Sequence, residues 1–339
     1  MRRLIWPAAP NANPMPSVSV IIATHERPRL LPRAVDSARA AGADVEVVVV
    51  DDASADETAA VCRSLPDINY VRVERNRKVA GARNVGILNS RGEYITFLDD
   101  DDKRLAGSLD LQADALRSAP EAGLVYGQAL IADQSGHAAG DFYPVRCPRG
   151  DVFWELLCQN FIPCGAALFR RSCLLRTGLL DEAVPGIDDW DLWIRIASLY
   201  AVAATETPVM VWRRPTPFSG QGTSRAREMV RMISAQSRRK WFRLARAAAA
   251  PPERRHEARR RLSKNMASHL AVETARAAAA GHLLLAQRNA LAALRLHPWA
   301  SARVMFSPPA LGFLAAGARG KATTIGRYDS PLETEAERK

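Results

Sequence analysis

Four consecutive carboxylates follow a segment that has the composition of a buried strand. Residues 94–98 are uncharged and mostly aromatic or β-branched, and the run 99–102 (Asp-Asp-Asp-Asp) comes directly after them. Adjacent anions repel each other, so a cation must offset that repulsion if the four carboxylates converge. Oxygen ligands at a strand end suit a hard divalent ion, Mg2+ or Mn2+, that keeps positions open for phosphate oxygens. The alternative is a solvated acidic turn that caps the next helix, and the preceding apolar strand makes the two interpretations about equally well supported.

A second acidic pair, Asp51 and Asp52, closes a predicted strand at 45–50. Ligands of an open α/β sheet bind in the crevice beyond the carboxyl ends of its strands, so the two acidic segments indicate a nucleotide site along one edge. The chain has no G-x-G-x-x-G after its first strand and no G-x-x-x-x-G-K-[ST], which disfavours a dinucleotide fold and a P-loop. We therefore expect phosphate to be held by the metal and by basic side chains such as Arg83.

A third acidic cluster, at 188–191, opens a segment with helical spacing. Asp188 and Asp189 fall at the predicted N-terminus of this helix, where a capping role is worth about 1 kcal/mol. Clustered acids near an anion site can also raise the pKa of one member toward a value that suits a general base. Position alone favours the cap over the base.

The elements that must position these residues alternate along the chain. Strands are predicted at 18–23, 45–50, 70–73 and 94–98, and helices at 29–41, from 56 onward, and within 76–90. This alternation predicts an α/β fold with a doubly wound, mostly parallel sheet. Further on, the sequence predicts short strands at 124–127 and 129–131, a turn at 133–136, a helix at 152–159, a strand at 202–212 and a mobile loop at 213–224.

Composition and charge limit the class of protein. The 339 residues are 47% hydrophobic and 24% charged, and the net charge of +11 predicts an anionic partner. The five cysteines form no C-x-x-C pair, so reduced thiols are expected. No uncharged run reaches the roughly 18–20 residues that span a bilayer, so we expect a cytoplasmic protein that is either free or peripheral at the inner face of a membrane.

The Arg-rich segment 225–264 has three interpretations: a solvated helical surface, a contact with anionic membrane, and a nucleic-acid site. The last is the weakest because aromatic residues are not interleaved with the arginines apart from Trp241 and Phe242. The expected organisation is a flexible leader at 1–16, a catalytic domain at 17–225, a basic and Ala-rich helical region at 226–321 and a disordered tail at 322–339.

Five segments, in order, resemble the motifs of family 2 glycosyltransferases, an inverting group with the GT-A fold. VSVIIATHER at 18–27 resembles the family's VSVIIPTYNR, and VDDAS at 50–54 resembles its VDDGS. Asn76 with ARNVG at 82–86 is similar to N…ARNxG. FLDDDD at 97–102 resembles FLDxDD, which contains the DxD element, and DDWDLW at 188–193 resembles the base motif ED-W-DLW. The resemblance covers roughly residues 16–225 and implies a non-processive glycosyltransferase.

The resemblance also implies a role for each matched residue. The donor is a nucleotide-diphosphate sugar, of the UDP or dTDP type, and the acceptor is a glycan, a lipid-linked glycan or a small molecule. Asp189 is then the general base and Asp188 supports it. Mg2+ or Mn2+ is held by Asp101 and Asp99, while Trp190 and Asp191 contact the acceptor. The residues implied in binding the nucleotide sugar are Thr24, Glu26, Asp52, Asn76, Arg83, Asp99 and Asp100.

Some positions depart from the family pattern. Ala23 and Ala53 replace the usual Pro and Gly, and Asp188 replaces Glu. Residues 236–241 (Gln-Ser-Arg-Arg-Lys-Trp) differ by one residue from the Q-x-x-R-W of processive members, a likeness that we interpret as coincidence. Two other classes remain as alternatives: a metal-dependent nucleotidyltransferase, and a non-catalytic protein that binds anionic ligands or membranes through its basic C-terminal region.

Overall fold

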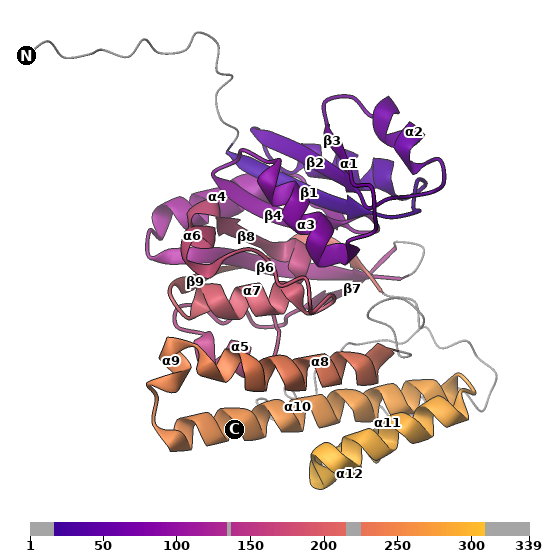
Figure 1. Ribbon diagram of the computed structural model, residues 1–339, viewed down its shortest axis with the longest axis vertical. Coiled ribbons are helices and arrows are strands. Elements are labelled where there is room, and N and C mark those ends of the chain that lie inside the picture. Colours follow the sequence, from indigo (N-terminus) through magenta and orange to yellow (C-terminus); the bar gives the residue numbers. More distant parts are fainter. Residues whose placement is uncertain (1–16, 134–136, 215–224, 309–339) are drawn as a thin grey trace, which may run out of the picture.

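The computed structural model describes residues 17–133, 137–214 and 225–308, which form a mixed sheet, helices on both of its faces, and a further layer of helices (Figure 1). The sheet has the order β3-β2-β1-β4-β8-β6-β9-β5, and β7 pairs with β6. Its strands are β1 Val18–Thr24, β2 Val45–Asp51, β3 Asn69–Arg72, β4 Tyr94–Asp99, β5 Lys103–Arg104, β6 Ala122–Ala132, β7 Ala138–Tyr143, β8 Ala167–Arg170 and β9 Ala201–Arg213.

The sheet is parallel from β3 to β4 and mixed beyond it. β1 pairs in parallel with β2 and β4, and β2 with β3. β8 runs antiparallel to both β4 and β6, so β6 and its parallel neighbour β9 point in the same direction as β1. Six of the nine strands in the described residues therefore share one direction, and the predicted α/β class with a mostly parallel sheet is confirmed.

Alternation along the strands gives the sheet two buried faces. On β1, Val20 and Ile22 pack with α1 and α4, whereas Ile21 packs with α3 and α7. Both faces are buried because helices cover both, which explains the nearly continuous apolar runs at 18–23 and 45–50. The helices of this part are α1 Leu31–Ala40, α2 Thr58–Ser64, α3 Lys78–Leu88, α4 Ser108–Ser118, α5 Phe153–Cys158, α6 Leu174–Thr177 and α7 Asp188–Ala197.

Helix α3 lies so close to β1 that only glycine fits at position 86. A Cβ built on Gly86 would lie 2.3 Å from Cγ2 of Ile21. We expect Gly86→Ala to lower the free energy of unfolding by about 1–3 kcal/mol, because overpacking the core outweighs the better helix propensity of alanine. Urea denaturation tests this, with Leu88→Ala on the exposed face of the same helix as the control. A Gly86→Ala protein as stable as the parent would contradict the packing argument.

The C-terminal helices pack into the apolar core on the face of the sheet that carries α3, α5 and α7. They are α8 Ala226–Arg239, α9 Ala245–Ala248, α10 Pro252–Ala279, α11 Leu283–Leu296 and α12 Pro298–Met305, with a 3-10 turn at Trp241–Arg243. Figure 1 shows them as a layer beyond α5 and α7. Val230, Trp241 and Leu262 belong to the same buried cluster as Phe97 and Trp193. The predicted boundary at 225/226 stays a prediction, and the apolar core continues across it.

Most of the predicted elements appear with small shifts of their ends, and the differences have local causes. The two short strands at 124–127 and 129–131 are the single strand β6, in which Gly127 lies against Val209 and Thr205 rather than breaking the strand. The Ala/Leu-rich pattern at 267–296 predicts one helix, and this prediction is wrong, because Gly281, with φ +78°, follows the end of α10 and α11 begins two residues later. The predictions for residues 1–16, 134–136, 215–224 and 322–339 concern segments outside the described residues.

Two further expectations concern cysteines and membrane spans. All five cysteines are free thiols, as expected. Across 17–133, 137–214 and 225–308, no helix combines the length and the apolarity that crossing a bilayer requires.

Candidate active site

The carboxyl ends of three parallel strands bring the predicted acids to one edge of the sheet. Thr24, the last residue of β1, lies opposite Asp51 of β2, and Ala23 lies opposite Asp99 of β4. Because parallel strands end at the same edge, the local sequence pattern fixes this convergence. The two acidic segments that the sequence indicated are therefore neighbours in the structure.

Three of the four carboxylates after β4 form a cluster suited to a cation. Oxygens of Asp99, Asp101 and Asp102 all lie within 4.8 Å of one another. Burial, followed by the charges of Asp99 and Asp101, raises the pKa of Asp102 well above its usual value. Sequence reasoning did not assign Asp102 a role. Its place in the acidic run makes it one of four candidates, but the run does not show which of the four converge.

The fourth carboxylate, Asp100, is turned toward β1. It accepts hydrogen bonds from Thr24 Oγ1 at 2.7 Å and from Arg27 Nη1 at 2.8 Å. Burial raises its pKa to about 6, against the opposing effect of Arg27. Thr24 is buried and its hydroxyl is engaged by Asp100. Both residues therefore shape the acidic loop in the described structure.

Arg213 closes the acidic loop from the far end of the sheet. Its Nη2 lies 3.0 Å from Asp101 Oδ2, and its backbone N–H donates to Asp102 Oδ1 at 2.8 Å. Arg213 ends β9, which is separated from β4 by more than 100 residues in the chain. The sequence placed this residue in a loop and gave it no role, and no local signal could have found it.

Arg83 connects the acidic loop to the third acidic cluster. Its Nη2 lies 2.7 Å from Asp99 Oδ1 and its Nη1 lies 2.9 Å from Asp188 Oδ2. The side chain is buried, and its guanidinium lies 5.2 Å from the ring centroid of Phe97. The predicted phosphate ligand is thus a bridge between two carboxylates, and it fixes the separation of β4 and α7 at this point.

Asp189 is buried at the start of α7 and does not cap this helix. No side chain caps α7, whose cap residue is Ile187. Asp188 is fully buried and accepts from Gly186 N, while Asp189 Oδ1 accepts from Trp190 N at 2.7 Å. Burial, with the charge of Asp188 next, raises the pKa of Asp189 to about 7. The other oxygen, Oδ2, accepts no hydrogen bond within the part of the chain that the structure describes.

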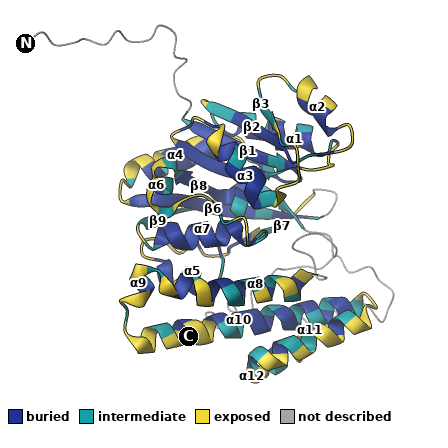
Figure 2. Cartoon of the chain, in the orientation of Figure 1, coloured by how far each residue is buried: buried dark blue, intermediate teal, exposed yellow. Residues whose placement is uncertain are grey.

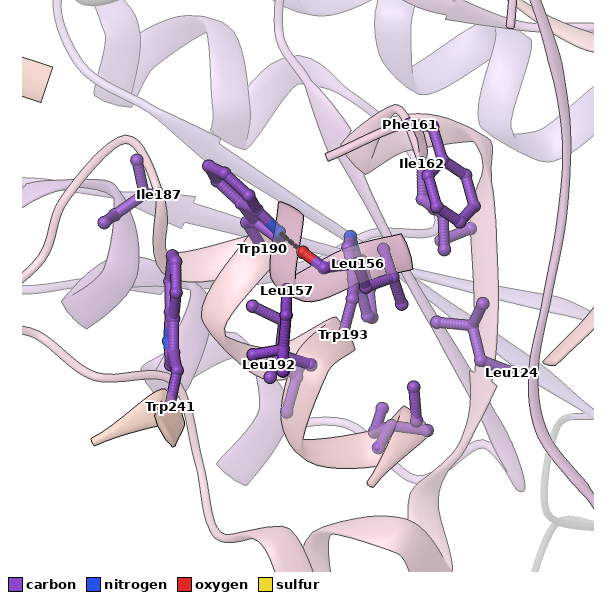
Figure 3. Close-up of a cluster of buried hydrophobic side chains, with 14 of the residues drawn as sticks. Leu124, Leu156, Leu157, Phe161, Ile162, Ile187, Trp190, Leu192, Trp193 and Trp241 are labelled. Atoms are coloured by element: carbon purple, nitrogen blue, oxygen red, sulfur yellow. Dashed lines mark hydrogen bonds between the residues drawn. The ribbon is translucent and has the colours of Figure 1, made fainter. Parts of the chain in front are cut away.

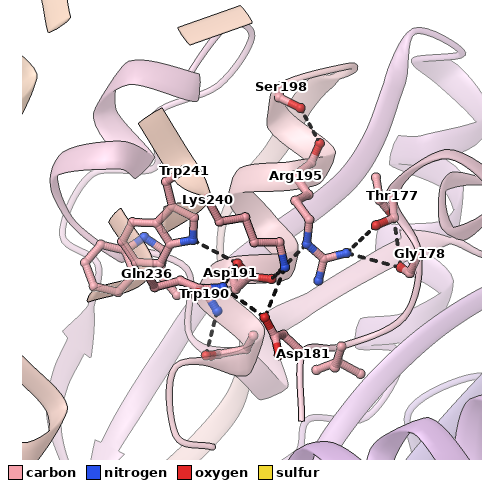
Figure 4. Close-up of polar contacts among 12 residues, drawn as sticks. Thr177, Gly178, Asp181, Trp190, Asp191, Arg195, Ser198, Gln236, Lys240 and Trp241 are labelled. Atoms are coloured by element: carbon pink, nitrogen blue, oxygen red, sulfur yellow. Dashed lines mark hydrogen bonds and ion pairs between the residues drawn. The ribbon is translucent and has the colours of Figure 1, made fainter. Parts of the chain in front are cut away.

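Asp191 is the centre of a buried polar network, which we call the Asp191 cluster (Figure 4). Its carboxylate accepts from Arg195 on the same helix and from three side chains of the C-terminal region: Gln236 Nε2 at 2.8 Å, Lys240 Nζ at 3.0 Å and Trp241 Nε1 at 2.8 Å. Residues 236–241, whose likeness to Q-x-x-R-W we interpret as coincidence, thus anchor the segment 188–193 through these three side chains. Asp191, predicted to contact the acceptor, is fully buried here.

Trp190, the other predicted acceptor contact, lies in the core beside this cluster. Its Nε1 donates to Leu156 O at 2.7 Å, and its ring lies 4.9 Å from that of Trp241 (Figure 3). Only 7% of the residue is exposed. In the described structure, Trp190 and Asp191 therefore position α7, and their exposed surface is small.

The residues expected at the nucleotide end lie on loops after β1, β2 and β3. Asp52 Oδ1 accepts from Arg77 N at 2.7 Å, and Asn76 Oδ1 accepts from Lys78 N at 3.0 Å, next to the start of α3. Glu26 is exposed and has a φ of 54°. Ala53, which replaces the family's glycine, has a φ of 62°, a left-handed conformation that explains why glycine is usual there.

Comparisons with known proteins agree with this geometry. Residues 19–174 match the model of Glycosyl transferase family 2. The succinoglycan biosynthesis protein ExoO of Rhizobium meliloti is 43% identical over 96 residues, which cover 27% of this chain and 28% of that protein. A GalNAc(5)-diNAcBac-PP-undecaprenol beta-1,3-glucosyltransferase of Campylobacter jejuni is 34% identical over 135 residues, 38% of this chain and 42% of that protein. A mannosyltransferase of Pyrobaculum calidifontis, solved with GDP-Man and Mn2+, superposes with a TM-score of 0.56 at 21% identity, over 93% of this chain and 87% of that one.

Residues 19–174 therefore form a family 2 glycosyltransferase domain with the GT-A fold, as the motifs indicated. The structural likeness extends the fold assignment over most of the chain. The chain spans less than half the length of both curated relatives.

Proposed function

We propose that this protein transfers a sugar from a nucleotide-diphosphate sugar, of the UDP or dTDP type, to a hydroxyl group with inversion at the anomeric carbon. The observation that carries the proposal is the Arg83 bridge. It ties Asp99, in the acidic cluster, to Asp188, the neighbour of Asp189. A cation site and a candidate base are thereby held in one active site, which is what a displacement at a sugar diphosphate needs.

The residues present fit a divalent metal. Three carboxylates converge within 4.8 Å, and such a donor set suits a hard ion such as Mg2+ or Mn2+. The pKa of Asp102 is raised first by burial and then by the charges of Asp99 and Asp101, and a bound cation would counter both effects. We assign the ion to Asp99 and Asp101, with Asp102 as a further ligand. When bound, it would neutralise charge on the leaving diphosphate.

The residues at the ends of β1 and β2 bind the nucleotide in this proposal. Asp52 accepts from the base, Thr24 and Glu26 line the base and ribose, and Asn76 lies at the same end of the site. Asp100 holds the acidic loop against Thr24 and Arg27. Arg83 lies at the diphosphate end and sets the position of Asp99.

Asp189 acts as the general base. Its free oxygen takes the proton of the acceptor hydroxyl as that oxygen bonds to the anomeric carbon, and the bond from this carbon to the diphosphate breaks on the opposite face. One displacement inverts the configuration. Asp188 supports Asp189 through its charge and its contact with Arg83, and a pKa of about 7 keeps the base poised near neutral pH.

A glycan, free or lipid-linked, is the proposed acceptor class. Support comes from relatives whose names refer to succinoglycan biosynthesis and to a GalNAc(5)-diNAcBac-PP-undecaprenol substrate. We place the protein in the cytoplasm, where nucleotide sugars are made available to such enzymes.

Thermal shift with nucleotide diphosphates and their sugars, each with Mn2+, Mg2+ or EDTA, tests the donor site. A ligand at about 100 times its dissociation constant should add about 2.7 kcal/mol to the stability of the folded state. We expect a metal-dependent shift for one uridine or thymidine compound, and its loss in Asp101→Asn. Asp114→Asn, on the exposed face of α4, is the matched control.

The two other classes give different results in this experiment. A nucleotidyltransferase would respond to a nucleoside triphosphate and release pyrophosphate. A binding protein with a degenerate sugar-nucleotide domain would show no shift with any diphosphate. Either result would contradict the proposal that this protein is an active glycosyltransferase.

A further inference from the structure

A groove of about 500 Å³ lies among the C-terminal helices and is lined only by residues of α8, α10 and α11. Its apolar lining includes Val230, Leu270, Leu291 and Leu296. Five arginines complete the lining: Arg227, Arg231 and Arg238 on α8, and Arg288 and Arg295 on α11. None of the residues assigned to the active site takes part. We call this feature the arginine groove.

The spacing of the arginines places them in two rows. Positions 227, 231 and 238 fall on one face of α8, and positions 288 and 295 fall on one face of α11. None of the five is in an ion pair with another described residue, whereas the buried side chains of Arg83 and Arg195 are paired. The groove therefore holds positive charge that no partner within the described chain offsets.

The charge of the whole helical region has the same sign. Residues 226–308 contain seventeen Lys or Arg and four Asp or Glu, a net charge of +13 that exceeds the +11 of the entire chain. No acidic residue occurs between Glu273 and Asp329. An anionic partner that needs no bridging metal ion is therefore expected at this region rather than at the acidic sheet edge.

Helix α11 has an apolar face that no residue of the described ranges covers. It buries Ala286, Asn289 and Ala293, and it exposes leucines such as Leu284 and Leu291 (Figure 2). On the next helix, 84% of Trp299 is exposed. Small side chains face inward and large apolar ones face outward, which is the reverse of an ordinary surface helix. Leu284, Arg288, Leu291 and Arg295 share one face of α11, so apolar and basic groups alternate along it.

We propose that the arginine groove and the exposed face of α11 and α12 dock on a bilayer that contains acidic phospholipid. The arginines meet lipid phosphates, and the leucines and Trp299 enter the boundary between headgroups and acyl chains. A bilayer with acidic phospholipid would contact both the basic and the apolar side chains of this surface. A nucleic acid would use the arginines and leave the leucines exposed to water.

Vesicle sedimentation of the full chain tests the proposal, with phosphatidylcholine vesicles that contain or lack phosphatidylglycerol. Arg231→Gln, Arg238→Gln, Arg288→Gln and Arg295→Gln are combined in a groove variant. The matched control makes the same charge change at exposed arginines elsewhere: Arg33→Gln, Arg63→Gln, Arg146→Gln and Arg149→Gln. A third variant, Leu284→Gln with Leu291→Gln, keeps the charge and removes apolar surface.

The parent is expected to sediment with acidic vesicles only. The groove variant should bind about 600-fold more weakly, since each of the four arginines near an anionic surface contributes roughly a fivefold effect. The leucine variant should bind about tenfold more weakly, and the control should bind like the parent. All substituted side chains are exposed, and thermal unfolding will verify that each variant folds.

Several results would overturn the proposal. One is a parent protein that does not sediment with acidic vesicles. Another is a control that loses as much binding as the groove variant, which would reduce the effect to net charge. Unchanged binding in the leucine variant would point to an electrostatic ligand such as nucleic acid. A parent dimer that dissociates on leucine substitution, without vesicle binding, would show that a second copy covers this face.

Discussion

Asp189→Asn is expected to lower kcat by about 10²- to 10⁴-fold, the usual contribution of a general base, while the metal-dependent thermal shift with the donor persists. The reason is geometric, because Asp189 offers the free oxygen beside a neighbour held by Arg83. Asparagine keeps the shape and the hydrogen bond from Trp190 N, so the variant should fold. Asp36→Asn, at the protein surface, is the control and should retain full turnover.

The pH dependence of the same residue supplies an independent check. Because Asp189 acts in its deprotonated form and its pKa is about 7, kcat/KM should fall about tenfold per pH unit below that value. The folded-state pKa exceeds the usual value for aspartate, so the folded state binds the proton more tightly. The stability of the parent should therefore decrease as pH rises from about 4 to 7, and this part of the slope should vanish in Asp189→Asn. A kcat/KM that stays constant between about pH 5.5 and 7.5 would contradict the assignment of Asp189 as the base.

Asp191→Ala should lower the free energy of unfolding by about 3–5 kcal/mol, because it leaves buried donors and positive charge without a partner. The carboxylate is fully buried and accepts from Arg195, Gln236, Lys240 and Trp241. Burial by itself would raise the pKa of Asp191, but Arg195 and these hydrogen bonds bring it below the usual value. Its contribution to stability is therefore present near neutral pH and is lost as the pH falls through this lowered value.

Urea denaturation measures this effect, and Asp181→Ala is the matched control. Asp181 also contacts Gln236 and Lys240 but is partly exposed, so its loss should cost less than about 1 kcal/mol. Trp241→Phe should be non-additive with Asp191→Ala, since the two residues share one hydrogen bond. Equal losses in Asp191→Ala and Asp181→Ala would show that the cluster is not the anchor of α7.

The sequence predicted the acids of the site because they follow strands whose local pattern is strong. Once β1, β2 and β4 are parallel, Thr24, Asp51 and Asp99 must meet at one edge. The partners of these acids were not predictable in the same way. Arg213 reaches Asp101 from a strand at the other side of the sheet, and Trp241 reaches Asp191 from beyond the expected domain boundary. Such contacts depend on tertiary packing, which no local spacing encodes.

The antiparallel strands show the same limit. β5 has only the residues Lys103 and Arg104, too few for a pattern, and its pairing depends on β9. Asp102 was overlooked because a run of four identical residues gives no sign of which side chains converge. Only the direction of each side chain separates Asp100 from its neighbours.

The Asp191 cluster also bears on how the chain is made. Trp241 follows Asp191 by 50 residues, so the ribosome completes the sheet and α7, with Arg195, before the three C-terminal donors to this aspartate have been synthesised. At about 5–20 residues per second, the interval is roughly 3–10 s. During that time Arg195 is the one partner of Asp191 already present among the four described, and the surface of α7 that Trp241 covers in the finished protein is not yet packed. The packing of α7 is thus complete only when the basic C-terminal segment has been translated.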